Sequence, residues 1–320
     1  MRLIFVGSGY LGLPTLKRLA PQILLVVTAP DKPAGRGLGI ISTPVKRLAR
    51  QLYLPVIETN NINSPETTAI MITHQPEVIV VAAFGQMLKT KVLEIPKYCV
   101  LNIHPSLLPK GRGAAPIERA ILNREEETGI SIFKINERMD AGPIIFQKKI
   151  TILPGEDALS LSQRLAELSA EVLPNLLERL TKGEVIFTPQ DEASATYAPK
   201  ITKEEGRIDW KKDALEIEAK VRAFVKWPHA YSFFPAKPSQ EGGNRDEHRR
   251  FIIWKAQAVE AKEEDKIPPG TILKADEDGI TVACGNGLLV IKELQVAGKK
   301  RMPIAEFLLG HKVAPGTVLI

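Results

Sequence analysis

The first 188 residues alternate between short apolar runs and amphipathic helical patterns, and this alternation constrains the fold most. Residues 3–6 (LIFV), 23–27 (ILLVV) and 78–83 (VIVVAA) are continuous apolar runs, as expected of strands buried on both faces. Residues 11–20 and 42–52 lie between them and have the spacing of helices. Strand, helix and strand in this order predict a parallel sheet with helices on both faces.

The pattern of apolar and polar residues changes twice further along the chain. A long amphipathic pattern from residue 158 is ended by Gly183, and residues 189–206 are a mixture of Pro, Thr, Ala and charged residues. After a further helical pattern, short strand-like runs are separated by the turn sequences EDG (277–279) and GNG (285–287), which is typical of a small barrel. The prediction is an α/β chain: a Rossmann-like open, mostly parallel sheet (1–188), a linker (189–206) and a small OB-like C-terminal β-barrel (207–320).

Three glycines near the start suggest a dinucleotide enzyme. Gly7, Gly9 and Gly12 form G-x-G-x-x-G directly after the first strand, and Asp31 follows nineteen residues later, near the place of a ribose-binding acid. A tight turn between strand and helix needs small residues with or without a ligand. Asp31 also opens a Gly/Pro-rich loop instead of ending the second strand. We therefore expect close packing at these glycines and no NAD.

Composition bounds the remaining classes of function. The chain has 44% hydrophobic and 25% charged residues, and its net charge of +6 permits a polyanionic partner without requiring one. Its two cysteines lack a C-x-x-C arrangement, which is typical of a reducing compartment. The N-terminal apolar run is too short for a signal peptide, and no run of 18 apolar residues occurs. A cytoplasmic protein without a membrane partner is expected.

Candidate chemistry is concentrated at the end of the strand expected at 99–104. Asn102 and His104 are two residues apart, so their side chains point to the same side of that strand, at the sheet edge where open α/β folds build their sites. An amide donor beside an imidazole suits acyl transfer, because both can stabilise a developing oxyanion. Asp140 lies on a tight turn and could orient His104. Each of these residues could instead cap a loop or a turn.

The sequence does not favour two other kinds of site, a serine nucleophile and a metal centre. Ser106 lies close to His104, but no G-x-S-x-G elbow surrounds it, so a binding or turn role is favoured. The five histidines, at positions 74, 104, 229, 248 and 311, have no metal-ligand spacing. No metal is therefore expected.

Several motifs in order resemble the folate-dependent formyltransferase family. They include PDKPAGRG (30–37), LNIHPSLLPKGRGAAPI (101–117), MDAGPII (139–145) and, toward the C-terminus, WPHAY (227–231) and LQVAGKKRM (294–302). The resemblance runs nearly end to end. The C-terminal motifs are similar to the branch of the family that acts on methionyl-tRNA.

The resemblance implies a reaction and a set of site residues. A formyl group would pass from 10-formyltetrahydrofolate to the α-amino group of methionine on initiator tRNA. Asn102 and His104 would stabilise the oxyanion of a tetrahedral intermediate, while Asp140 holds His104 and assists proton transfer. The residues implied for the folate pocket are Ser106, Leu107, Leu108, Pro109, Phe84, Gly85, Gln86 and Leu88.

The resemblance also implies contacts with tRNA. The basic residues expected to bind it are Lys32, Arg36 and Lys46 in and after the PDKPAGRG loop, and Lys299, Lys300 and Arg301 near the C-terminus. A solvated charged turn is the competing interpretation of the last three. Nothing in the sequence demands an oligomer, so a monomer is expected.

Rival functions remain open at the level of sequence. An amino-sugar nucleotide formyltransferase or a 10-formyltetrahydrofolate hydrolase would carry the same three catalytic residues. A dinucleotide oxidoreductase is supported only by the glycine run, and a non-catalytic RNA-binding module only by the basic charge and the predicted barrel.

Overall fold

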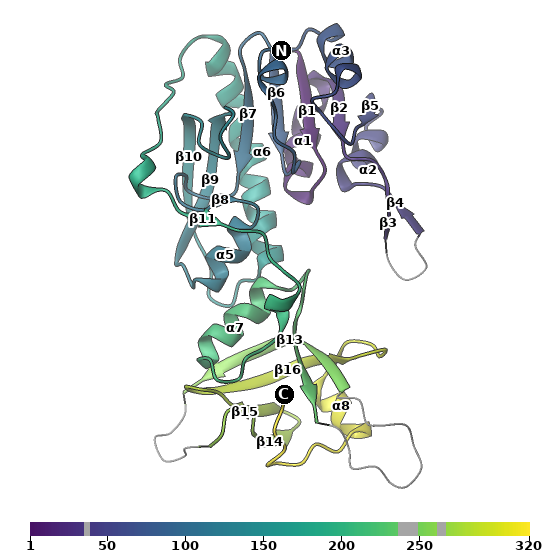
Figure 1. Cartoon of the computed structure of the whole chain (residues 1–320), viewed down its shortest axis with the longest axis vertical. Helices are drawn as coiled ribbons and strands as arrows, with labels where there is room; N and C mark the ends of the chain where they lie inside the picture. Colours follow the sequence, from purple (N-terminus) through teal and green to yellow (C-terminus); the bar gives the residue numbers. More distant parts are fainter. Residues whose placement is uncertain (35–38, 236–248, 261–266) are drawn as a thin grey trace. The chain divides into compact units, whose positions relative to one another are not determined.

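The computed structural model describes residues 1–34, 39–235, 249–260 and 267–320 of the chain (Figure 1). The chain divides into two compact units. The first comprises residues 1–117, 126–152 and 160–200, and the second comprises residues 118–125, 153–159 and 201–320. Arg36 and residues 236–248 lie outside the described residues.

A seven-stranded sheet forms the centre of the first unit (Figure 1), in the order β10-β9-β7-β6-β1-β2-β5. Five of these strands are parallel, and β9 and β10 extend the sheet antiparallel at one edge. The strands are β1 (Leu3–Gly7), β2 (Ile23–Thr28), β5 (Val56–Glu58), β6 (Val78–Ala82), β7 (Cys99–His104), β9 (Glu127–Lys134) and β10 (Ile144–Thr151). The predicted open, mostly parallel sheet is confirmed.

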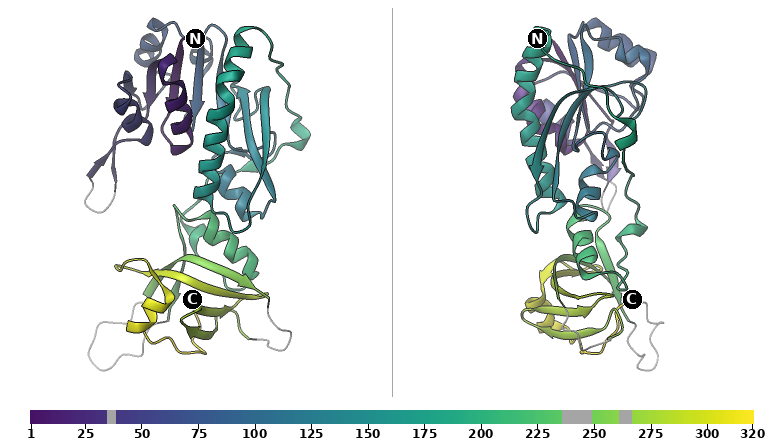
Figure 2. Two further views of the ribbon diagram at one scale, coloured as in Figure 1. Left: turned by 180° about the vertical axis from the view of Figure 1, so that it is seen from behind. Right: turned by 90° about the vertical axis from the view of Figure 1, so that its left-hand side faces the viewer.

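Helices cover both faces of this sheet (Figure 2), because alternate residues of each buried strand point to opposite faces. Leu3 and Phe5 of β1 pack in one cluster with residues of α1, α2 and α6. Ile4 and Val6 pack on the other face with residues of α3 and α4. The helices of this unit are α1 (Leu13–Leu19), α2 (Pro44–Gln51), α3 (Pro65–Thr73), α4 (Thr90–Leu93) and α6 (Ala158–Thr181), whereas most of α5 (Pro116–Leu122) belongs to the second unit.

The glycine run of the first turn is explained by packing. A Cβ added at Gly7 would lie 2.6 Å from the carbonyl oxygen of Ala82, and one at Gly12 would lie 2.8 Å from the ring of Phe5. The amide groups of Ser8 and Gly9 donate to the carbonyl oxygen of Ala83. These amides are therefore used inside the fold, and the three glycines have a reason that involves no ligand.

Asp31, the candidate ribose-binding acid, is engaged elsewhere. Its carboxylate lies 2.7 Å from the ammonium group of Lys46, which also lies 2.6 Å from Glu58. The hydrogen bond from Lys46 lowers the pKa of Asp31. This ion-pair network ties the start of the loop after β2 to α2 and β5.

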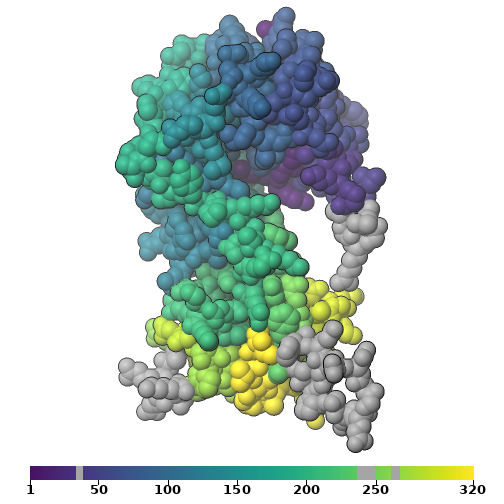
Figure 3. Space-filling view, in the orientation of Figure 1, coloured from purple at the N-terminus to yellow at the C-terminus, as the bar shows by residue number. Residues whose placement is uncertain are grey.

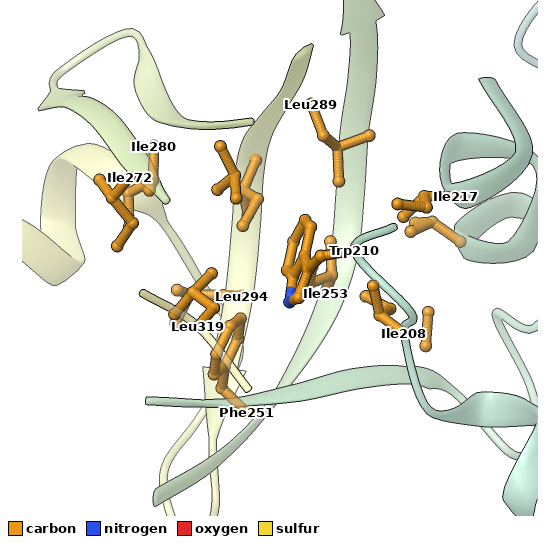
Figure 4. Packing of buried hydrophobic residues seen from close by; sticks show 14 of the residues in the cluster. Ile208, Trp210, Ile217, Phe251, Ile253, Ile272, Ile280, Leu289, Leu294 and Leu319 are labelled. Atoms are coloured by element: carbon orange, nitrogen blue, oxygen red, sulfur yellow. The ribbon is translucent and has the colours of Figure 1, made fainter. Parts of the chain in front are cut away.

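The second unit is built on an antiparallel sheet in the order β12-β13-β16-β15-β14, with β17 paired to β16. Trp210, Phe251, Ile253 and Leu294 belong to its core (Figure 4), and the Trp210 indole donates to Ser232 Oγ at 2.9 Å. The elements are α7 (Ala214–Ala223), β12 (Ala230–Phe234), β13 (Arg249–Val259), β14 (Ile272–Asp276), β15 (Gly279–Ala283), β16 (Leu288–Val296), β17 (Met302–Pro303) and α8 (Ile304–Gly310).

The second unit is the small antiparallel β-domain that the sequence predicts, but its barrel is not closed, because β12 and β14 remain opposite edges of the sheet path. The C-terminal residues make hydrogen bonds to both edges instead. Phe233 and Ile320 exchange backbone hydrogen bonds of 3.1 and 3.0 Å, and the amide of Ile272 donates to the carbonyl of Thr317 at 2.8 Å. The end of the chain therefore satisfies edge groups that barrel closure would otherwise pair.

Between α6 and the second unit, the expected linker carries short regular elements. It contains a 3-10 turn, η3 (Glu192–Ser194), and the strand β11 (Tyr197–Ala198), which pairs in parallel with β8 (Arg112–Gly113). The remaining short elements are β3 (Lys32–Ala34), β4 (Gly39–Ile41) and the 3-10 turns η1 (Tyr10–Gly12), η2 (Ala20–Gln22) and η4 (Glu204–Gly206). Across the described residues, no helix has the length and apolar character needed to span a membrane.

Candidate active site

A cavity of about 580 Å³ opens at the carboxyl edge of the first unit's sheet. Asn102 and His104, near the C-terminal end of strand β7, both line it, and so does Asp140 from the loop between β9 and β10. The structure thus brings these three side chains together at one cavity. Sheet pairing accounts for it, since β7 lies between β6 and β9.

His104 and Asp140 are held by the loop that follows β7. The ring of His104 is buried, and its Nε2 atom lies 2.8 Å from the carbonyl oxygen of Gly111. The amide of Gly113 donates to Asp140 Oδ2 at 2.8 Å. Asp140 has a φ of 49°, in the left-handed region that non-glycine residues rarely occupy. One loop therefore contacts both candidate catalytic groups.

Asn102 differs from its neighbours because its amide side chain has no hydrogen-bond partner among the residues that the structure describes. It is partly exposed and lines the cavity. A free amide beside a buried imidazole can donate to an oxygen that enters the cavity. An oxyanion formed there is the species such donors stabilise best.

The residues implied for the folate pocket separate into two groups. Phe84, Gly85, Gln86 and Leu88 line the cavity, which is largely apolar as a flat ring ligand requires. Ser106, Leu107, Leu108 and Pro109 do not line it. Ser106 donates to the carbonyl of Lys110 at 2.6 Å, and the amide of Leu108 donates to Ser131 Oγ at 2.9 Å. In this structure the second group shapes the loop beneath the site.

Sequence reasoning missed a charged cluster next to Asp140. Arg112 is only 1% exposed, and its guanidinium contacts Gln190 and Glu192. Arg138, at the cavity, also contacts Glu192 at 2.6 Å. The hydrogen bonds from Arg112, with those from Arg138, lower the pKa of the Glu192 carboxyl to about 2. No local pattern marked this cluster, because Arg112 and Gln190 are far apart in the sequence.

Comparison with known proteins places the chain in a family. Residues 15–177 match the Formyl transferase family, and residues 200–312 match the Formyl transferase C-terminal domain. The chain is 41% identical to the methionyl-tRNA formyltransferase of Caldanaerobacter subterraneus, over 100% of both chains. It is 39% identical to that of Geobacter sulfurreducens, over 100% of this chain and 96% of the relative.

The chain belongs to the methionyl-tRNA formyltransferase family. Solved structures share the formyltransferase fold at lower identity. HypX from Aquifex aeolicus in complex with tetrahydrofolic acid has a TM-score of 0.61 and 20% identity, over 99% of this chain and 50% of that chain. An N-formyltransferase from Helicobacter canadensis has a TM-score of 0.64 and 18% identity, over 91% and 99%. At these identities the likeness concerns the fold alone.

The basic residues expected to bind tRNA have different environments in this formyltransferase. Lys32, Lys299 and Lys300 are exposed. Lys46 is only 4% exposed and is bonded to two carboxylates, so its ammonium group serves the fold in this structure. Arg301 forms an ion pair with Glu293 and lies 4.9 Å above the ring of Trp254. Among the described residues, no group of three or more His, Cys, Asp or Glu could hold a metal ion.

Proposed function

We propose that this chain transfers the formyl group of 10-formyltetrahydrofolate to the α-amino group of methionine on initiator tRNA, for translation initiation. The observation that carries the proposal is the meeting of Asn102, His104 and Asp140 at one cavity. The full-length similarity to methionyl-tRNA formyltransferases supports the choice of acceptor.

The three side chains suit direct attack by the amine. The amine nitrogen forms a bond to the formyl carbon, and the carbonyl electrons move onto oxygen. Asn102 donates a hydrogen bond to this oxyanion, and the ring of His104, which lines the same cavity, also stabilises it. The attacking nitrogen loses a proton to the carboxylate of Asp140, whose Oδ2 atom lies 3.7 Å from His104 Nδ1, and the oxyanion then collapses to restore the carbonyl group. Breakage of the bond to N10 of the folate, with a proton returned to N10, completes the transfer. An amide donor of this kind contributes about 3–4 kcal/mol to such transition states.

The tRNA contacts in this proposal rest on exposed basic residues. Lys32 in the first unit, and Lys299 and Lys300 in the second, form no ion pair with the residues that the structure describes, unlike Lys46 and Arg301. Their ammonium groups would contact phosphates, which fixes position more than it reads sequence. Arg36 belongs to the same proposal but lies outside the described residues.

The proposed reaction also bears on the oligomeric state and the location of the enzyme. Nothing in the sequence demands an oligomer, so we propose that the enzyme acts as a monomer. Aminoacylated initiator tRNA is a substrate of the translation apparatus, so we propose that the enzyme works in the cytoplasm.

A sugar N-formyltransferase and a folate hydrolase are the rivals, because they would use the same catalytic groups. Formyl transfer in vitro distinguishes the three. Transfer to methionyl initiator tRNA supports the proposal, whereas turnover only with water or an amino-sugar nucleotide would replace it.

A further inference from the structure

A segment that sequence analysis treated as a linker crosses the surface of the first unit beside the active site. We call residues 188–198 the strap. In Figure 1 it runs from the end of α6 past the edge of the sheet to β8, and Figure 3 shows it on the molecular surface. Its residues are mostly exposed, so burial of apolar area does not explain its path. Its polar contacts do.

The Gln190 side chain of the strap uses all four of its hydrogen-bonding positions. Its Nε2 atom donates to the carbonyl oxygens of Asp140 at 2.8 Å and Gly142 at 2.7 Å. Its Oε1 atom accepts from Arg112 Nε at 3.1 Å and Nη2 at 2.8 Å. A glutamine amide has two donors and two acceptor sites, so this one is fully satisfied. The contacts with Arg112 also fix which end of the amide faces Asp140.

The strap also holds the loop that supports His104. The amide of Arg112 donates to the carbonyl of Thr196 at 2.9 Å, and the amide of Gly111 donates to Thr196 Oγ1 at 2.9 Å. Gly111 is the residue whose carbonyl oxygen contacts His104, and Gly113 is the residue whose amide binds Asp140. The strap therefore anchors the shared support of both groups, and Gln190 reaches the Asp140 backbone directly.

Asp140 needs such an anchor. Its backbone has a φ of 49°, and a non-glycine residue stays in this region only when its surroundings hold it there. The carbonyl oxygen of Asp140 is fixed by Gln190 and its carboxylate by Gly113. Loss of the first contact would let the peptide rotate, which would move the carboxylate away from His104.

We propose that Gln190 is a positioning residue that sets the Asp140 carboxylate against His104. Gln190 is not a catalytic residue, because it does not line the cavity and acts through the backbone of Asp140. The kinetic part of this inference rests on the proposed formyl transfer, whereas the structural part does not.

The sharpest variant is Gln190→Glu. It preserves the shape of the side chain and the acceptor for Arg112. It replaces the two N–H donors with an oxygen that faces the carbonyls of Asp140 and Gly142, so the contacts under test are lost, and it adds a negative charge beside Arg112. Gln190→Leu removes all four hydrogen bonds and serves as the second variant. Ser194→Ala is the matched control, because it removes a strap contact to Asp191 without touching Asp140.

The first readout is spectroscopic and requires no activity. The amide resonance of Gly113 reports its hydrogen bond to Asp140 Oδ2 and can be assigned in protein labelled with ¹⁵N-glycine. In Gln190→Glu and Gln190→Leu it should move toward its position in Asp140→Ala, and in Ser194→Ala it should stay at the parent position. A parent-like Gly113 resonance in both Gln190 variants would overturn the inference.

The second readout is kinetic. We expect kcat to fall on the order of 10- to 100-fold in Gln190→Glu, the scale of a small misplacement of a catalytic group, with the KM of both substrates unchanged. In an Asp140→Ala background the same substitution should cause no further loss, because coupled residues are non-additive. An equal additional loss in that background would show a general structural role and overturn the inference. A parent enzyme without formyl transfer would refute the proposed function, while the Gly113 resonance would still decide the role of Gln190.

Discussion

The Nδ1 atom of His104 lies 3.7 Å from Oδ2 of Asp140. This distance is longer than a direct hydrogen bond. The other ring nitrogen, Nε2, lies 2.8 Å from the carbonyl oxygen of Gly111, which can only accept, so Nε2 carries a hydrogen. A second proton on His104 would therefore reside on Nδ1, the atom that faces Asp140. Catalytic contacts of this length commonly tighten when substrate binds.

The unpartnered amide of Asn102 leads to a kinetic prediction. Asn102→Ala should lower kcat for formyl transfer by about 10²- to 10³-fold, the usual cost of one oxyanion donor. Affinity for tRNA should be unchanged, because the amide lies in the cavity. Asn123→Ala, an exposed asparagine that does not line the cavity, is the control. Single-turnover rates and tRNA binding measured on both variants check this, and a parent-like rate in Asn102→Ala would refute the role.

Glu192 gives a prediction about stability and pH. Its folded-state pKa is about 2, below its ordinary value of 4.5, chiefly because Arg112 donates to it. A carboxylate with a lowered pKa stabilises the fold above pH 4.5, and this contribution is lost as the pH falls toward 2. Glu192→Gln should therefore lower Tm at pH 7, and its difference from the parent should shrink below pH 4.5. Thermal melts across this range test it, and a difference independent of pH would contradict it.

The packing explanation of the glycine run can be tested at Gly12. Gly12→Ala would place a methyl group 2.8 Å from the ring of Phe5 and 3.1 Å from Ala82 Cβ. We expect a loss of about 1–3 kcal/mol in the free energy of unfolding, as for an overpacked core. Gly310→Ala, where nothing lies within 4 Å, is the control and should be neutral or stabilising. Urea denaturation of both variants gives the comparison, and equal stabilities would count against tight packing at Gly12.

The exposed lysines of the second unit should contribute to tRNA binding through charge. Replacing Lys299 and Lys300 with alanine should weaken binding, and each lost phosphate contact should reduce the slope of log K against log salt by about 0.7–0.9. Lys149→Ala, an exposed lysine of β10, should leave the slope unchanged. Binding titrations over a range of salt concentrations measure this. An unchanged slope in the double variant would show that these lysines form only a solvated turn.

Local periodicity was sufficient to predict much of the site. The two-residue spacing of Asn102 and His104 predicted a shared side of β7, and the continuous apolar runs predicted the buried parallel strands. The strap was not predictable, because Gln190 and Arg112 meet through side-chain contacts between distant segments that leave no periodic signal. The open edges of the barrel were not predictable for the same reason. The pairing of Ile320 with Phe233 depends on where the end of the chain folds back.

The central claim is that this chain formylates methionyl initiator tRNA. The most direct measurement compares formyl transfer from 10-formyltetrahydrofolate to methionine charged on initiator tRNA, to methionine charged on elongator tRNA, and to water. We predict rapid transfer to the initiator tRNA alone. Turnover of the folate with water at the same rate, or equal transfer to both tRNAs, would contradict the proposed function.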